Sequence, residues 1–397
     1  MKASGSAMRV AFINSHPIQY HAKWFRALAE QPGLDVDVLY CHNATQAEQA
    51  DAGFGVSFEW DVPLFDGYRY RFLRNAARQP SIASFSGLDT PELQTLIRGG
   101  QYDAVVTNGW HFKSAWQAIW ACWQSGVPIL VRSDSHLHTD RGVVKSLLKA
   151  APYRAFIPRL DGCLPVGRWS ADYFRYYGAE PNRVHIVPHV VDSTFESESN
   201  RVADQRPRFR ESWGFGPEDT VFLFAGKFIA KKRPLDFVRA VHRAHVQNPR
   251  VVGLMVGDGL LRRDCEAAAR ESGLPIRFVG FLNQSEIIPA YVAADVLVLP
   301  SDGGETWGIV VNEAMSCGKP AFVSDRVGCG PDLVIASETG FIFPLGDVEV
   351  LSSLMTEGAA DPNRLVAMGE NARRRMRDYS VSVAVDRLTQ ALTRIRQ

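Results

Sequence analysis

The sequence predicts an α/β protein with two lobes, each built on a parallel β-sheet with helices on both faces. The chain has 397 residues, and at about 100 to 200 residues per domain this length predicts two domains. In both halves, short apolar runs alternate with longer helical patterns, an order typical of parallel sheets. The pattern stops between residues 193 and 219, where Ser, Glu, Arg and Pro gather. We therefore expect one lobe on each side of this interruption.

The first lobe is predicted to cover residues 8–195. Residues 8–14 (MRVAFIN) are apolar enough for a buried strand. A helix over 20–31 follows, because Phe25, Leu28 and Ala29 recur at helical spacing. Further strands are expected at 35–40, 104–107, 128–131 and 162–166, with a helix over 114–124.

The second lobe is predicted to cover residues 219–375, after a linker over 196–218. Its strands are expected at 220–225, 251–256, 276–279, 296–300 and 320–324. A helix over 307–317 should end at Gly318, with Pro320 just beyond it. The chain ends in a further helical pattern, with its last part over residues 376–397. Both lobes are then Rossmann-like, and such sheets bind ligands beyond the carboxyl ends of their strands.

Composition excludes several classes of protein. Lys and Arg number 44 against 43 Asp and Glu, a net charge of +1, so no overall field favours nucleic acid. The six cysteines include no C-x2-C pair, so we expect no zinc or other metal site and reduced thiols. The N-terminal residues do not resemble a signal peptide and no apolar stretch is long enough to span a membrane. We expect a cytoplasmic protein without a nucleic-acid partner or a bound cofactor.

The segment 299–320, LPSDGGETWGIVVNEAMSCGKP, carries two notable carboxylates. Glu313 lies on a helix that is apolar nearly all round, where an unpaired charge is costly. Glu305 lies at the junction of a Gly-rich loop and this helix, where free N–H groups and the helix dipole favour anions. A helix cap at Glu305 and an internal salt bridge at Glu313 are the structural alternatives to ligand binding.

A basic loop follows the first strand of the second lobe. In FAGKFIAKKRP, residues 224–234, Gly226 permits close backbone approach and Lys227, Lys231 and Lys232 follow. These cations suit a doubly charged anion, although a solvated basic loop is the alternative. Gly257 repeats the turn after the next strand.

These motifs resemble a known family. Glu305 and Glu313, with seven residues between them, resemble the paired glutamates of the retaining GT-B glycosyltransferases of glycosyltransferase family 4. Gly226-Lys227-Phe228 with Lys232 is similar to the phosphate loop of that family, although Lys227 replaces an arginine and Arg233 a glycine. The resemblance extends over roughly residues 160–345. It implies the GT-B architecture, in which two Rossmann-like lobes with parallel sheets face each other across a cleft. In that architecture the last helix, here residues 376–397, crosses back to the first lobe.

The resemblance also implies roles for residues of the second lobe. Glu313 would bind the ribose hydroxyls of a nucleoside diphosphate sugar, and Glu305 would lie beside the sugar. Lys227 and Lys232 would hold the diphosphate in place of a metal ion. Further donor-binding positions are expected at Gly226, Gly257, Phe281, Leu282, Gly304, Thr306, Trp307 and Gly308.

The first lobe would bind the acceptor and contribute polar side chains to the cleft. His16, in the loop after the first strand, is expected near the diphosphate or the acceptor, with a structural polar contact as the alternative. A later loop offers Arg132, Asp134 and His136, of which Asp134 and His136 are favoured. Ordinary helix capping is the alternative for this loop.

The expected function is retaining, metal-independent transfer of a hexose-type sugar, from a UDP- or GDP-linked donor, to a hydroxyl of a glycan, glycolipid or natural product. Polysaccharide biosynthesis is one compatible setting. The alternatives are a nucleotide-sugar epimerase and a nucleotide-sugar-binding partner subunit without activity. The basic amphipathic segment 141–159 predicts either a peripheral contact with the inner face of the membrane, and with it a lipid-linked acceptor, or a solvated helix packed on the first lobe.

Overall fold

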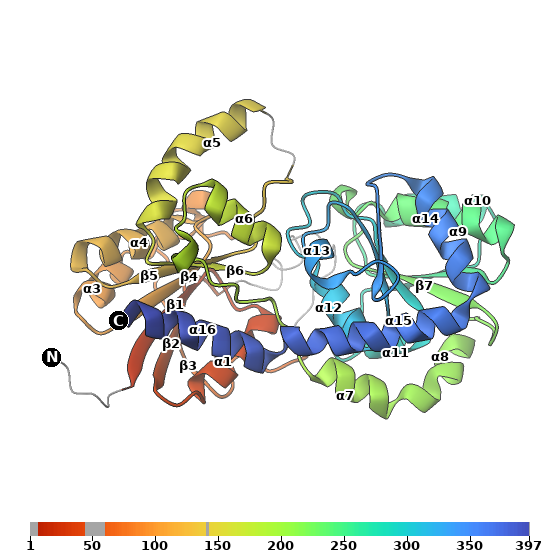
Figure 1. Cartoon of the computed structure of the whole chain (residues 1–397), viewed down its shortest axis with the longest axis horizontal. Coiled ribbons are helices and arrows are strands. Elements are labelled where there is room, and N and C mark those ends of the chain that lie inside the picture. The colour runs from red at the N-terminus through yellow and green to blue at the C-terminus, as the bar shows by residue number, and fades with distance from the viewer. Residues whose placement is uncertain (1–6, 44–59, 140–142, 397) are drawn as a thin grey trace.

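The molecule consists of two α/β lobes that lie side by side (Figure 1). The computed structural model describes residues 7–43, 60–139 and 143–396. Each lobe is built on a six-stranded sheet in which paired strands run parallel. The predicted fold class is therefore confirmed.

The sheet of the first lobe has the order β3-β2-β1-β4-β5-β6. Its strands are β1 (Met8–Asn14), β2 (Leu34–Tyr40), β3 (Arg69–Phe72), β4 (Ala104–Asn108), β5 (Ile129–Ser133) and β6 (Gly162–Pro165). Its helices are α1 (Gln19–Ala29), α3 (Glu92–Arg98), α4 (Lys113–Ser125), α5 (Val143–Phe156) and α6 (Arg168–Tyr176). Strand β3 was not predicted, because its four residues, RYRF, are all exposed and form no apolar run.

The sheet of the second lobe has the order β12-β11-β10-β7-β8-β9. Its strands are β7 (Thr220–Ala225), β8 (Val251–Val256), β9 (Ile276–Gly280), β10 (Val296–Leu299), β11 (Ala321–Ser324) and β12 (Gly340–Phe343). The helices after β7 are α9 (Pro234–Gln247), α10 (Arg262–Glu271), α11 (Ile288–Ala293), α12 (Ile309–Ser316), α13 (Gly330–Leu333), α14 (Val348–Ala360) and α15 (Pro362–Arg375). The edge strand β12 is the one that sequence analysis missed here.

Strand order places the candidate site. In the second sheet the order changes direction between β7 and β10, so a crevice opens beyond their carboxyl ends. Strand β7 (TVFLFA) is buried along its whole length, as expected for a central strand covered on both faces. The loops that follow β7, β8 and β10 therefore project from a rigid base.

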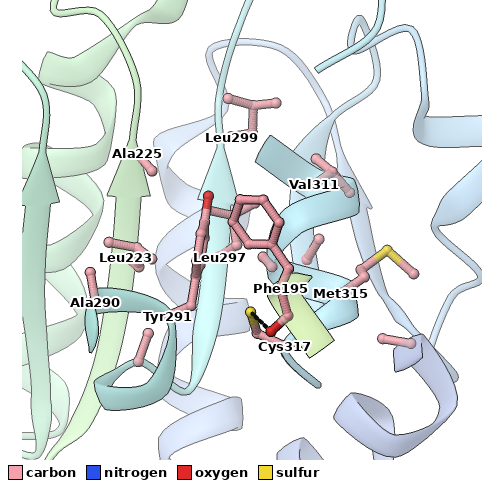
Figure 2. Packing of buried hydrophobic residues seen from close by; sticks show 14 of the residues in the cluster. Phe195, Leu223, Ala225, Ala290, Tyr291, Leu297, Leu299, Val311, Met315 and Cys317 are labelled. Carbon is pink, nitrogen blue, oxygen red and sulfur yellow. Dashed lines mark hydrogen bonds between the residues drawn. The ribbon is translucent and has the colours of Figure 1, made fainter. Parts of the chain in front are cut away.

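Residues 196–218, expected as a linker, contain helical structure that packs into the second lobe. Helices α7 (Thr194–Arg201) and α8 (Arg206–Ser212) lie here. Phe195, Val202 and Phe215 are buried in the core of the second lobe. Figure 2 shows the Phe195 ring beside Tyr291, with the Cys317 thiol donating to the Phe195 carbonyl at 3.5 Å. Because these apolar residues are widely spaced in a polar segment, the sequence did not predict that the segment packs into the core.

The chain ends on the first lobe. Helix α16 (Val381–Arg396) lies beside α1 (Figure 1). Its residues Ala384, Val385, Leu388, Ala391 and Leu392 belong to a buried cluster of the first lobe. Helix α16 therefore packs against the first lobe although it follows the second lobe in the sequence.

Helix α5, which projects from the first lobe, lies wholly within the basic segment 141–159 (Figure 1). The Lys149 ammonium lies 4.5 Å from the ring centre of Tyr153, and the Arg159 guanidinium lies 4.3 Å from that of Trp123. These cations are thus engaged with aromatic rings of their own lobe. Arg141 lies outside the described residues. Among the residues described, no helix has the length and apolar composition needed to cross a membrane.

Candidate functional site

A cavity of about 310 Å³ lies at the carboxyl edge of the second sheet, between the two lobes. Its wall includes the following residues that the sequence singled out: Gly226, Lys227, Lys232, Gly257, Phe281, Leu282 and Glu313. They come from the loops after β7, β8 and β9 and from helix α12. The structure therefore brings the basic loop and one of the two glutamates into a single site.

Two glycine turns shape the floor of the cavity. Gly226 has a φ of 151° and Gly257 a φ of 127°, values that side-chain-bearing residues rarely adopt. A Cβ atom on Gly257 would lie 1.9 Å from the Gly226 carbonyl oxygen. The two turns pack this closely because Gly257 lacks a side chain, and the contact fixes the start of the basic loop.

The basic loop presents three lysines to the cavity, Lys227, Lys231 and Lys232. Burial, followed by the charges of Lys231 and Lys232, lowers the pKa of Lys227 to about 8. The Lys231 ammonium donates to the Gly304 carbonyl at 3.3 Å, which ties this loop to the one after β10. Three ammonium groups are therefore gathered at one end of the cavity, where Glu305 pairs with Lys232.

Glu305 forms an ion pair with Lys232 and is buried. The Ser301 hydroxyl donates to the same carboxylate at 3.2 Å. Burial raises the pKa of Glu305, but the charge and hydrogen bond of Lys232 outweigh it and hold that pKa below 4.5. Glu305 is not a helix cap, because α12 begins only at Ile309, after Gly308.

Glu313 lies on α12 and faces the cavity with neutral partners. The Tyr291 hydroxyl donates to its carboxylate at 2.6 Å, and Gln284 also hydrogen-bonds to it. Burial is the main cause that raises the pKa of Glu313 to about 7. Glu313 is therefore a carboxyl group with a raised pKa at the wall of a cavity. Groups with perturbed pKa values cluster at functional sites.

Helix α12 is shorter than the predicted 307–317 and points its first turn at the cavity. Gly308, with a φ of 98°, precedes the helix, and Ile309 and Val310 line the cavity. The Trp307 indole N–H donates to Asn312 at 2.8 Å, and its ring is buried. Trp307 is therefore a structural anchor of the loop, and its side chain is not part of the cavity wall.

The loop after β10 also joins the two lobes. The Thr306 hydroxyl donates to the Asp134 carboxylate at 2.6 Å. A Cβ atom on Gly303 would lie 2.3 Å from the His138 carbonyl oxygen, so the two loops touch. Asp134 is therefore bonded across the seam between the lobes and does not line the cavity. Gly304, Glu305, Thr306 and Gly308 lie in the same loop and are likewise absent from the wall.

The histidines and Arg132 also lie outside the cavity wall. The His16 ring nitrogen is 3.0 Å from the Ser15 hydroxyl. His136 is buried and its Nδ1 accepts from the His138 N–H at 3.2 Å. Arg132 donates to the Pro188 carbonyl at 3.2 Å and lies over the Trp24 ring. These side chains therefore make contacts inside the first lobe and at its boundary with the second lobe.

A second cavity, of about 320 Å³, adjoins the first. The two share Gln19, Gln284, Ile309 and Glu313 in their walls. Glu313 therefore lies between two spaces in the interlobe region. Within the described ranges, no group of three or more His, Cys, Asp or Glu side chains is placed to hold a metal ion.

Sequence analysis missed several residues of the wall, namely Gln19, Trp60, Gln284, Ile287, Ile309 and Val310. Gln284 lies two residues after Leu282, an expected donor-binding position, and this proximity was the one available signal. Trp60 lies between β2 and β3 of the other lobe, and no local pattern marks it.

Two family models together match most of the chain. Residues 205–375 match the glycosyl transferases group 1 family, and residues 17–189 match the glycosyl transferase 4-like domain. These boundaries follow the two lobes of the structure.

Curated relatives support the same grouping. The D-inositol 3-phosphate glycosyltransferase of Rhodococcus jostii (strain RHA1) is 29% identical over 231 residues, which cover 56% of this chain and 50% of the relative. The chain spans about half the length of most of the curated relatives it matches. A protein of the same name from Corynebacterium efficiens is 26% identical over 96% of this chain and 94% of its own.

Solved structures share the architecture. The Anabaena protein Alr3699/HepE, in complex with UDP, superposes with a TM-score of 0.74 at 15% identity, over 97% of this chain and 100% of that one. At this level of identity the likeness concerns the fold.

Proposed function

Because this chain belongs to the family 4 glycosyltransferases with the GT-B fold, we propose that it transfers a hexose-type sugar from a nucleoside diphosphate sugar to a hydroxyl acceptor, with retention at the anomeric carbon. The observation that carries this proposal is the single cavity that brings Lys227 and Lys232 together with Glu313. Its charges match the charged and hydrogen-bonding groups of such a donor.

The lysines supply the site for the diphosphate. Lys227 and Lys232 place two ammonium groups on one loop, and the first turn of α12 adds N–H groups and the positive end of a helix dipole. As the bond to the leaving phosphate breaks, negative charge grows there, and fixed cations stabilise it. These groups support a transfer that requires no metal ion.

Glu313 supplies the site for the ribose. Two adjacent hydroxyls can donate to one carboxylate, and hydrogen bonds to a charged acceptor are stronger than neutral ones. The Tyr291 hydroxyl already holds this carboxylate in place at 2.6 Å. Donor binding would favour the ionised form of a group that is otherwise half protonated near pH 7.

In the proposed reaction, the bond between the anomeric carbon and the β-phosphate oxygen breaks. The acceptor oxygen forms the new bond on the same face of the sugar, and its proton passes to the departing phosphate oxygen. This route needs no separate protein base. Structures of HepE hold UDP, and one holds UDP and glucose, which supports a UDP-linked hexose as the first donor to test.

The test is a screen of UDP-, GDP-, ADP- and dTDP-sugars by thermal shift, followed by product analysis with the stabilising donor and a set of hydroxyl acceptors. We expect release of nucleoside diphosphate only when an acceptor is present. The product should have the same anomeric configuration as the donor, and turnover should be unchanged in EDTA. A changed sugar without acceptor would support an epimerase instead. Binding without release in any acceptor would support a partner subunit.

A further inference from the structure

A short segment of the first lobe reaches the cavity of the second lobe. Trp60 is half-buried and lines the cavity beside residues of the second lobe, although it belongs to the connection between β2 and β3. Val62 and Pro63 line the adjoining cavity. We call residues 60–63 the interlobe strap.

The strap is held at both ends. On the first lobe, Arg26 of α1 donates to the Pro63 carbonyl at 3.3 Å and to the Asp66 carbonyl at 2.9 Å. On the second lobe, the Asp61 carboxylate accepts from the Ser285 backbone N–H at 3.0 Å and also from the Ser285 hydroxyl. The strap therefore connects the lobes at the turn that follows β9, next to Gln284.

The wall around Trp60 differs in chemistry from the lysine end of the cavity. Phe281, Leu282 and Ile287 contribute apolar side chains to the cavity wall, and Gln19 and Gln284 contribute polar ones, of which Gln284 hydrogen-bonds to Glu313. A flat, apolar body with hydrogen-bonding edges fits such a wall, and aromatic side chains contribute substantially to binding nucleic-acid bases. The proposed function assigns the diphosphate to the lysines and the ribose to Glu313. The base is the part of the nucleotide that still has no assigned site.

We propose that Trp60 forms the first-lobe wall of the base site, and that Asp61 positions it there through Ser285. This inference rests on the proposed function, because it assigns the base of the same donor. Trp60 contacts the base, whereas Asp61 is a positioning residue that acts through the strap. Donor affinity then depends on a contact between the lobes as well as on the second lobe.

The test for Trp60 is the dissociation constant for UDP, GDP and ADP, measured by calorimetry. We expect Trp60→Ala to raise the constant for the preferred nucleotide by about 10-fold or more, and Trp60→Phe to raise it by about 3-fold or less. The matched control is Trp120→Ala, because Trp120 lies on α4 and is 52% exposed. That control should bind the nucleotide like the wild type.

The test for Asp61 separates positioning from stability. Asp61→Ala should raise the same dissociation constant by about 3- to 10-fold, whereas Asp61→Asn keeps an oxygen that accepts from Ser285 and should restore most of the affinity. The control is Asp66→Ala, an exposed carboxylate near the strap. All three variants should unfold at the wild-type temperature, because Asp61 and Asp66 are exposed.

The outcomes distinguish this inference from the proposed function. If the wild type binds a nucleotide and Lys227→Ala weakens it, but Trp60→Ala binds like Trp120→Ala, the base site is wrongly assigned and the proposed function stands. If the wild type binds none of these three nucleotides and does not bind dTDP, both fail. Equal affinity in Asp61→Ala and Asp66→Ala would overturn the positioning role alone.

Discussion

Lys232 and Glu305 form an ion pair where the loop after β7 meets the loop after β10, and their side chains are only 12% and 10% exposed. The pair holds one cation of the proposed diphosphate site against a carboxylate that is itself held by Ser301. The charge at the site is therefore fixed before any ligand arrives, which is the condition for electrostatic stabilisation of a transition state.

Removal of Lys232 should damage both stability and activity. Lys232→Ala leaves the Glu305 charge buried without its partner, and we expect a loss of about 3 to 5 kcal/mol in the free energy of unfolding. The double variant Lys232→Met with Glu305→Gln removes both charges and should recover most of that loss. Turnover should stay about 100-fold or more below wild type in both.

Denaturant unfolding and turnover measure these effects. The control is the pair of Lys113 with Asp89, whose side chains are more exposed, at 45% and 20%, and Lys113→Met should cost about 1 kcal/mol or less. Full turnover in the double variant would show that Lys232 has no part in transfer.

Donor affinity should be highest between about pH 7 and pH 8. Below this range Glu313, with a pKa of about 7, becomes protonated and is a weaker acceptor for the ribose hydroxyls. Above it Lys227, with a pKa of about 8, loses its charge and no longer attracts the diphosphate. Affinity should therefore rise through pH 7 and fall through pH 8.

The measurement is calorimetric titration from pH 6 to pH 9 with an intact nucleotide sugar, since a terminal phosphate would itself titrate near pH 6. Glu313→Gln should abolish the rise at low pH. Lys227→Arg should abolish the fall at high pH, because arginine stays charged. An affinity that is constant over this range would contradict the assignment of both groups.

Gly257→Ala should weaken donor binding through the backbone alone. The new Cβ would lie 1.9 Å from the Gly226 carbonyl oxygen, at a φ of 127°, so the turn that carries Lys227 must move. We expect a cost of about 1 to 3 kcal/mol in unfolding free energy and about 10-fold or more in donor affinity.

The control for this prediction is Gly33→Ala, at a φ of 81° with no atom within 4 Å of the new Cβ. It should cost about 1 to 2 kcal/mol for the conformation and leave donor affinity unchanged. Similar affinities in the two variants would show that the contact between the turns does not shape the site.

The hydrogen bond between Thr306 and Asp134 joins the two lobes, and its removal should lower activity. Thr306→Val and Asp134→Ala are expected to lower kcat/KM by a similar factor, about 2- to 10-fold. The double variant should lose no more than either single one, since the two changes remove one interaction. A much larger loss in Asp134→Ala than in Thr306→Val would instead make Asp134 a group that touches the substrate.

The sequence predicted the fold where apolar runs were continuous. The ten expected strands are all present, because buried parallel strands need such runs. The edge strands β3 and β12 and the helices α7 and α8 were missed. The two strands are four residues long and lie at sheet edges. In the segment of α7 and α8 the apolar residues, such as Phe195 and Val202, are separated by polar ones, and only tertiary packing brings them into the core.

The site divides in the same way. Residues within one motif, such as Lys227 and Glu313, were located because their spacing along the chain carries the information. Arg233 stands where the family has glycine, and its φ of 51° shows that the backbone still takes the left-handed conformation. Trp60 and the bond between Asp134 and Thr306 depend on how the lobes meet, which no local pattern encodes.

The most direct test of the account is calorimetric titration of UDP and GDP into the wild type and into Lys227→Ala and Glu313→Ala. We predict one site per chain for the preferred nucleotide, with a dissociation constant of about 1 µM to 1 mM, and a loss of about 10-fold or more in each variant. Wild-type affinity in both variants would contradict the account, because the nucleotide would then bind elsewhere.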